Sequence, residues 1–144
     1  MHRAGEIVTT IFDALQPLLE DGPTLDVQRN SSRLPYDHPA VVVRMGQDLP
    51  DSVGTHFIDW DLVVHTDILT RSNTTSLDEE ALNIRNQIHV LLMANPDLNL
   101  AYVQSITPLG QSEPEYSGDG DKYTMAVRQS WQVKYRTSIN DPSQ

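Results

Sequence analysis

The chain of 144 residues contains no cysteine, which excludes disulfide bonds, thiolate metal ligands and cysteine nucleophiles. Aromatic residues make up only 6% of it, and no apolar run approaches the roughly 20 residues that span a lipid bilayer. Its first residues lack the basic and then apolar segments of a signal peptide. We therefore expect a soluble protein, without membrane association, that acts in the compartment where it is made.

Positive charge is also scarce, with 10 Lys and Arg residues against 20 Asp and Glu residues and a net charge of -10. Such a balance disfavours tight binding to a phosphate backbone, and it suits a surface that nucleic acid slides past. Acidity can equally serve solubility alone, so both explanations stay open. The 38% hydrophobic content is typical of a globular protein, and the length fits one domain with its own core.

The clearest pattern is the strict alternation over residues 56–69, HFIDWDLVVHTDIL. Apolar side chains fall on one side of this segment, and polar ones fall on the other together with Phe57 and Val63, which predicts a long strand with one buried and one polar face. The same alternation returns over residues 122–137. Three shorter strands are predicted at residues 25–29, 40–45 and 100–109, the last ending at Pro108.

Two amphipathic helices are predicted. Apolar residues at helical spacing mark the first over residues 4–20, and Pro17 should kink its last turn. The second covers residues 77–93 and begins with a capping box formed by Ser76 and Glu79.

The predicted order is α-β-β-β-α-β-β, in an α+β, two-layer domain. Its mixed, mainly antiparallel sheet carries two helices on one face. The single domain spans residues 1–137, and residues 138–144 form a flexible C-terminal tail. Two polar, glycine-containing segments, 46–54 and 111–121, are predicted to be exposed loops or flaps.

Candidate chemistry is limited. Asp59, Asp61 and His65 share the polar side of the long strand, and such carboxylates can bind a hard cation. Same-side neighbours on a strand lie about 7 Å apart, however, and no further ligand is evident, so an ion-paired or solvated face is favoured. The SGDGD segment fails as a calcium loop because its twelfth position, counted from Asp119, is Ser130 and not Glu.

A Gly-x-Ser-x-Gly elbow, a phosphate-binding loop and a dinucleotide fingerprint are all missing from the sequence. We therefore predict no catalytic residue, no cofactor and no bound metal, and we expect the protein not to be an enzyme.

Two predicted strands carry rows of opposite charge, and this pattern is more informative than the candidate metal site. The long strand places three carboxylates on its polar side, and the last strand places three cations on its own; these are Asp59, Asp61, Asp67, Arg128, Lys134 and Arg136. If the strands are neighbours, the rows form cross-strand ion pairs. If they are not, the rows can meet between subunits and set the register of an oligomer. The first interpretation needs fewer assumptions.

Several features occur together over residues 4–137. They are the Ile- and Leu-rich first helix, the proline-flanked loop LPYDHPAVVV that leads into a β-branched strand, the long alternating strand, the second helix and a closing strand pair. In this combination the chain resembles the tail terminator (tail completion) proteins of long-tailed bacteriophages.

This resemblance implies an α+β subunit of a hexameric ring at the head-proximal end of the virion tail, assembled in the host cytoplasm. Such a ring caps the tail tube, stops polymerisation of the tube protein and presents a surface to the head connector. DNA would pass through the ring without specific binding. A head-completion or neck connector protein is the nearest alternative, and a small acidic binding module or enzyme is a more distant one.

In a ring, the predicted subunit or tail-tube contacts are the polar side of the sheet and the two exposed loops. The candidate residues are Asp59, Asp61, Asp67, Arg128, Lys134, Arg136, Asp48, Asp51, Glu113, Glu115 and Tyr116.

Overall fold

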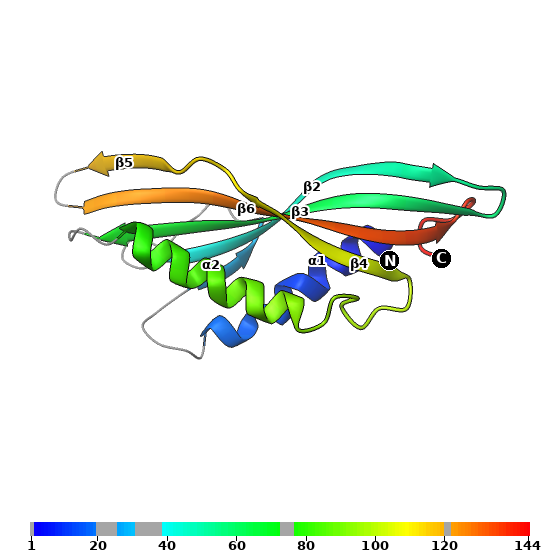
Figure 1. Ribbon diagram of the computed structural model, residues 1–144, viewed down its shortest axis with the longest axis horizontal. Helices are drawn as coiled ribbons and strands as arrows, with labels where there is room; N and C mark the ends of the chain where they lie inside the picture. The colour runs from blue at the N-terminus through cyan, green and yellow to red at the C-terminus, as the bar shows by residue number, and fades with distance from the viewer. Residues whose placement is uncertain (1, 20–25, 31–38, 73–76, 120–121) are drawn as a thin grey trace.

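A computed structural model describes residues 2–19, 26–30, 39–72, 77–119 and 122–144 (Figure 1). Two helices, a short 3-10 helix and six strands follow one another, and the predicted α+β class is confirmed. In chain order they are α1 (Arg3–Ala14), η1 (Gln16–Leu19), β1 (Asp26–Arg29), β2 (Ala40–Val53), β3 (Phe57–Ser72), α2 (Leu77–Met93), β4 (Val103–Gln111), β5 (Glu115–Asp119) and β6 (Lys122–Ser138).

All six strands form one twisted sheet in the order β1-β2-β3-β6-β4, with β5 also paired to β6 (Figure 1). Strand β1 runs parallel to β2, and the other pairs are antiparallel, so the predicted mixed, mainly antiparallel sheet is confirmed. Strands β3 and β6, the two segments with the strictest alternation, lie side by side at the centre, from the Phe57–Ser138 pair to the Ser72–Tyr123 pair.

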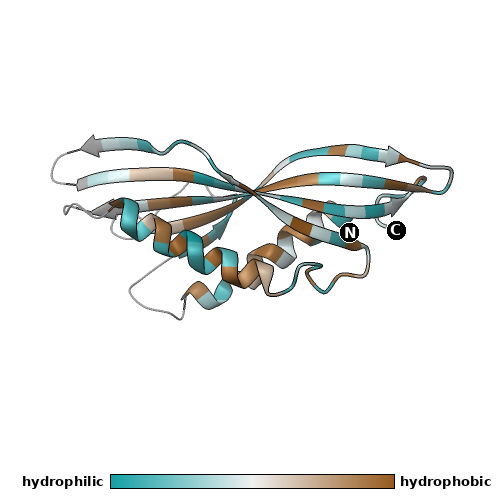
Figure 2. Cartoon of the chain, viewed as in Figure 1, coloured by the Kyte–Doolittle hydropathy of each residue, from teal (hydrophilic) through white to brown (hydrophobic). Residues whose placement is uncertain are grey.

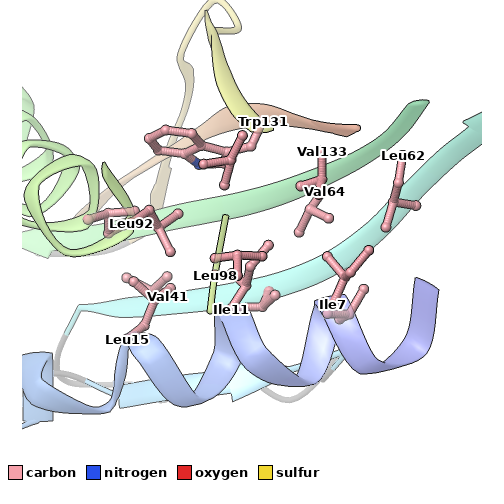
Figure 3. Packing of buried hydrophobic residues seen from close by; sticks show 14 of the residues in the cluster. Ile7, Ile11, Leu15, Val41, Leu62, Val64, Leu92, Leu98, Trp131 and Val133 are labelled. Atoms are coloured by element: carbon pink, nitrogen blue, oxygen red, sulfur yellow. The ribbon is translucent and has the colours of Figure 1, made fainter. Parts of the chain in front are cut away.

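Both helices cover the same side of the sheet, which we call the helix face; the opposite side is the polar face (Figure 1). The alternation along the strands appears as stripes in Figure 2. On the helix face, Ile7 and Ile11 of α1 and its C-cap residue Leu15 lie toward Val41 and the neighbouring strand residues (Figure 3). Each fully buried side chain of this kind contributes roughly 1.5–3 kcal/mol through removal of apolar surface from water.

The polar side chains of Thr66 and Gln129, which are buried on the helix face, form hydrogen bonds with buried neighbours. The fully buried Trp131 donates its Nε1–H to Thr66 Oγ1 at 3.2 Å, and Thr66 Oγ1 donates to Gln129 Oε1 at 3.1 Å. A buried polar atom without a partner would cost free energy, so this chain of hydrogen bonds explains why Thr and Gln are tolerated there.

The segment predicted as a loop at residues 46–54 belongs almost entirely to β2, which continues to Val53; that prediction was wrong. β3 is long enough to pair with it throughout, apart from irregularities between Met45 and Asp48 and between Pro50 and Ser52. Because β1 pairs only with residues 40–43 of β2, the rest is an edge in the described part of the sheet. Proline is tolerated at such an edge.

The predicted loop at residues 111–121 was also wrong in part, because β5 forms within it and pairs with residues 122–126 of β6. Strand β4 does not end at Pro108 but continues to Gln111 past an irregularity between Pro108 and Gly110. Gly110 has a φ of +93°, a conformation that glycine adopts without strain and that allows the strand to bend here.

The first helix is interrupted near Pro17, as predicted: α1 ends at Ala14 and the chain continues as a 3-10 turn. Ser76, the predicted N-cap of α2, lies outside the described residues. In residues 138–144, the Ile139 N–H donates to the His56 carbonyl at 2.9 Å and the Arg3 N–H donates to the Pro142 carbonyl at 3.1 Å. Flexibility of this tail stays a prediction. Neither α1 nor α2 has the length and apolar character needed to span a bilayer.

Candidate interaction site

The register of β3 and β6 brings the two predicted charge rows together on the polar face. Asp59 lies opposite Arg136, Asp61 opposite Lys134, and Asp67 opposite Arg128. The interpretation as cross-strand pairs within one sheet is therefore confirmed.

Asp59 and Arg136 form the pair with the best geometry. Arg136 donates from Nε to Asp59 Oδ1 at 2.7 Å and from Nη2 to Oδ2 at 3.2 Å, and Gln104 Nε2 adds a 3.3 Å hydrogen bond to Oδ1. The hydrogen bonds and charge of Arg136 lower the pKa of Asp59. Both side chains reach solvent, so screening by water limits what this pair adds to stability.

Lys134 joins three strands. Its Nζ donates to Asp51 Oδ2 of β2 at 3.1 Å and lies 3.7 Å from Asp61 Oδ1 of β3, which is beyond hydrogen-bond distance. Asp51 and Asp61 together raise the pKa of Lys134. This contact holds the distal part of β2 against β3 and β6.

Asp67 is held between two arginines. Arg128 donates from Nε to Asp67 Oδ1 at 2.8 Å and from Nη2 to Oδ2 at 3.0 Å, while Arg44 Nε donates to Oδ2 at 3.0 Å. Arg44 was absent from the predicted set, although it lies in the strand predicted at residues 40–45. Its position, one residue after the core residue Val43, was the available signal, since alternate strand residues face opposite sides.

These three residues border a hollow of about 540 Å³ on the polar face. Its remaining lining comes from Val42, Ile68, Leu69, Ser112, Glu115, Ala126 and Val127.

Asp48, also among the predicted contacts, lies on the other side of the sheet. It pairs in register with Leu62, a residue of the helix face, and Tyr135 Oη donates to Asp48 Oδ2 at 2.7 Å. Burial raises the pKa of Asp48, and the hydrogen bond from Tyr135 offsets part of that effect. Asp48 therefore fixes the base of the β2–β3 hairpin and does not belong to the charged rows.

The predicted contacts near β5 are exposed. Glu113 lies in the connection between β4 and β5, while Glu115 and Tyr116 belong to β5 and pair with Ala126 and Met125. Tyr116 is 65% exposed, which is high for a large aromatic residue. A role for these residues in contacts with other subunits stays a prediction.

The residues considered for a metal site have other partners. Asp59 binds Arg136 and Asp61 lies near Lys134, while His65 Nδ1 shares a 2.9 Å hydrogen bond with Ser130 Oγ. Burial lowers the pKa of His65. Among the described residues, no three His, Asp or Glu side chains are grouped so that they could hold one ion.

No protein family matches the sequence, and no curated protein is significantly similar to it. The fold, in contrast, matches a chain in the structure of the virion of a native gene transfer agent (GTA) particle. The TM-score is 0.54 at 13% sequence identity, and the match covers 89% of this chain and 94% of that chain. At this identity the likeness shows a shared fold, and it extends over nearly the whole of both chains.

One further feature of the surface was not predicted. The distal part of the β2–β3 hairpin, residues 48–61, extends beyond the helices to one end of the molecule, and we call it the arm (Figure 1). Large apolar side chains are exposed along it, with Leu49 at 52%, Val53 at 64% and Phe57 at 53%. The pattern was missed because residues 46–54, which include Leu49 and Val53, were predicted as a loop or flap, while Phe57 was placed on the polar side of the long strand.

Proposed function

We propose that the protein is a structural component of a phage-like virion and acts as a tail terminator. In this role, several copies form a ring, expected to be a hexamer, on the head-proximal end of the tail tube. The ring stops polymerisation of the tube and offers a surface to the neck. The observation that carries the proposal is the fold shared, over nearly the full length of both chains, with a chain of the gene transfer agent virion.

The surface chemistry supports an assembly role. On the polar face, carboxylates form ion pairs with Arg44, Arg128, Lys134 and Arg136. These ion pairs join neighbouring strands and so stabilise the sheet. Exposed apolar side chains lie at the arm and on α2, and patches of this kind mark contacts with other proteins. The independent resemblance in element order, from the first helix to the closing strand pair, points to the same class of protein.

Reconstitution with the tail tube protein of the same particle tests the proposal. Tubes assembled alone should grow to variable length. Tubes assembled with this chain should stop at a capped end, visible as a ring by negative-stain electron microscopy. Tubes that elongate freely and carry no cap in the presence of excess protein would overturn the role.

A pull-down separates the terminator from its nearest alternative. A terminator should bind assembled tail tube even when the head connector protein is absent. Binding to the connector alone, with no affinity for the tube, would instead identify a neck component.

A further inference from the structure

Resting on the proposed function, we infer that the arm of one copy inserts into a groove beside α2 of the next copy, so that the ring is built by a head-to-tail contact between identical chains.

The arm has the character of an inserted element. In the antiparallel register, Leu49 pairs with Asp61 of the polar face, whereas Val53 pairs with Ile58. Phe57 shares the parity of Asp59 and Asp61 along β3, so it lies with Leu49 on the polar face and Val53 lies on the other. A hairpin with exposed apolar side chains on both of its faces can bury them all only between two walls of a partner.

The receiving groove lies along the outer side of α2. One hollow of about 200 Å³ lies between α2 and η1 and is lined by Pro17, Leu18, Asn86, Gln87, Val90 and Leu91. A second of about 330 Å³ adjoins it at Asn86 and is lined by Leu82, Arg85, Asn86 and His89. The first hollow is large enough for an apolar side chain to enter.

Exposed apolar residues in the groove indicate a surface that binds another element. Val90 is 60% exposed and Leu82 is 51% exposed, two turns apart on the same side of the helix. A helix surface of this type typically packs against another element.

Charge complementarity identifies the occupant as a second copy. The arm carries Asp48, Asp51, Asp59 and Asp61 against two cations of β6, Lys134 and Arg136, so it is acidic. Among the residues that the structure describes, the groove lining contains Arg85 and His89 and no carboxylate. Arg85 donates to the neutral Gln111 Oε1 at 2.9 Å, so an approaching carboxylate would improve its environment. The first turn of α2, residues 78–80, is acidic and lies at one end of the groove. It would repel the acidic arm, so docking is favoured at the other end, toward Val90.

The position of the two surfaces sets the type of assembly. The β2–β3 turn lies at one end of the long axis, whereas α2 lies toward the other end (Figure 1). The arm therefore does not fill the groove of its own chain. A contact between two different surfaces of identical chains is heterologous, and it produces a closed ring when the rotation per subunit divides a full turn.

The test uses two variants that each lose one surface. Val53→Ser with Phe57→Ser removes two of the arm's three exposed apolar side chains, one from each of its faces, and Val90→Ser with Leu82→Ser removes the two exposed apolar side chains of the groove. Each variant should fold, as shown by circular dichroism, and should associate with itself at least about tenfold more weakly than the wild type by light scattering. Leu109→Ser, which alters a 51% exposed residue of β4 outside both surfaces, is the matched control and should leave association unchanged.

Mixing the two variants gives the decisive result. Each retains one intact surface, so an equimolar mixture should form pairs containing one chain of each and should stop there. A wild type that stays monomeric at its highest soluble concentration, an arm variant that assembles like the wild type, or a mixture with no pairs would overturn the inference.

The same variants separate this inference from the proposed function. Rings that cap tubes normally despite the arm substitutions would refute the arm contact and leave the terminator role standing. Arm-dependent association of a protein that never caps tubes would refute the terminator role alone.

Discussion

Gly46 lies where β2 passes close to β3, and the space there explains why no side chain is present. A Cβ at this position would lie 2.7 Å from His65 Nε2 and 2.9 Å from the Val63 carbonyl oxygen. The imidazole can rotate away, but the carbonyl belongs to the central strand and cannot move without disturbing its pairing.

We therefore expect Gly46→Ala to lower the free energy of unfolding by about 1–3 kcal/mol, the usual cost of overpacking. Gly54→Ala is the control, because its added Cβ would meet only the Phe57 carbonyl oxygen at 3.3 Å. Thermal unfolding of both variants measures the difference. Equal melting temperatures for the two would show that β2 adjusts freely at Gly46.

Asp48 predicts a dependence of stability on pH. Burial raises its folded-state pKa above the ordinary value of 3.8, so the folded protein binds the proton more tightly than the unfolded chain does. The contribution of Asp48 to stability is therefore largest below pH 3.8 and is lost as the pH rises through the folded pKa.

Asp48→Asn removes this titration, while its amide oxygen can still accept the hydrogen bond from Tyr135. The unfolding free energy of the variant minus that of the wild type should increase as the pH rises from 3 to 7, as measured by urea unfolding at each pH. A difference that stays constant over this range would mean that burial does not perturb the carboxyl.

At the scale of elements, ion pairs connect the central strands. The Asp67–Arg128 pair has two hydrogen bonds, and the side chains are 25% and 47% exposed. We expect a coupling energy of about 0.5–1 kcal/mol, which is ordinary for a well-oriented but solvated pair.

A double-mutant cycle with Asp67→Asn and Arg128→Gln measures this coupling by urea unfolding. Because the pair lies within one sheet, the oligomeric mass of the folded variants should match that of the wild type. A cycle without coupling, accompanied by loss of assembly, would show that these residues act between subunits instead.

The long elements were predictable because their burial is periodic. Strands β3 and β6 and the faces of α1 and α2 follow from alternation or helical spacing, and the charge rows followed from the same alternation. The distal part of β2 was missed because Pro50 and Gly46 are local turn signals, and only pairing with β3 overrides them. Arg44 and the arm were missed for a related reason, since their partners and exposure depend on which strands become neighbours.

At the scale of the whole molecule, the excess of carboxylates over cations has a consequence for binding to DNA. The net charge is -10, and on the polar face the cations Arg44, Arg128, Lys134 and Arg136 are all held by carboxylates. A phosphate backbone would have to displace those carboxylates before it could reach any of these four cations. A ring of such subunits would therefore let DNA pass without retaining it.

This arrangement predicts that the protein does not bind DNA. Fluorescence polarisation of a labelled duplex should stay unchanged up to ~100 µM protein at 0.15 M salt, where non-specific DNA-binding proteins dissociate at about 10⁻⁴–10⁻⁶ M. The matched variant, Asp59→Asn with Asp67→Asn, releases Arg136 and Arg128 from their carboxylates and removes two negative charges. It should show weak binding that appears only at low salt, because the attraction is electrostatic. Wild-type binding at micromolar protein would show that a cationic surface operates in spite of these pairs, and it would contradict passage of DNA through a non-adhesive ring.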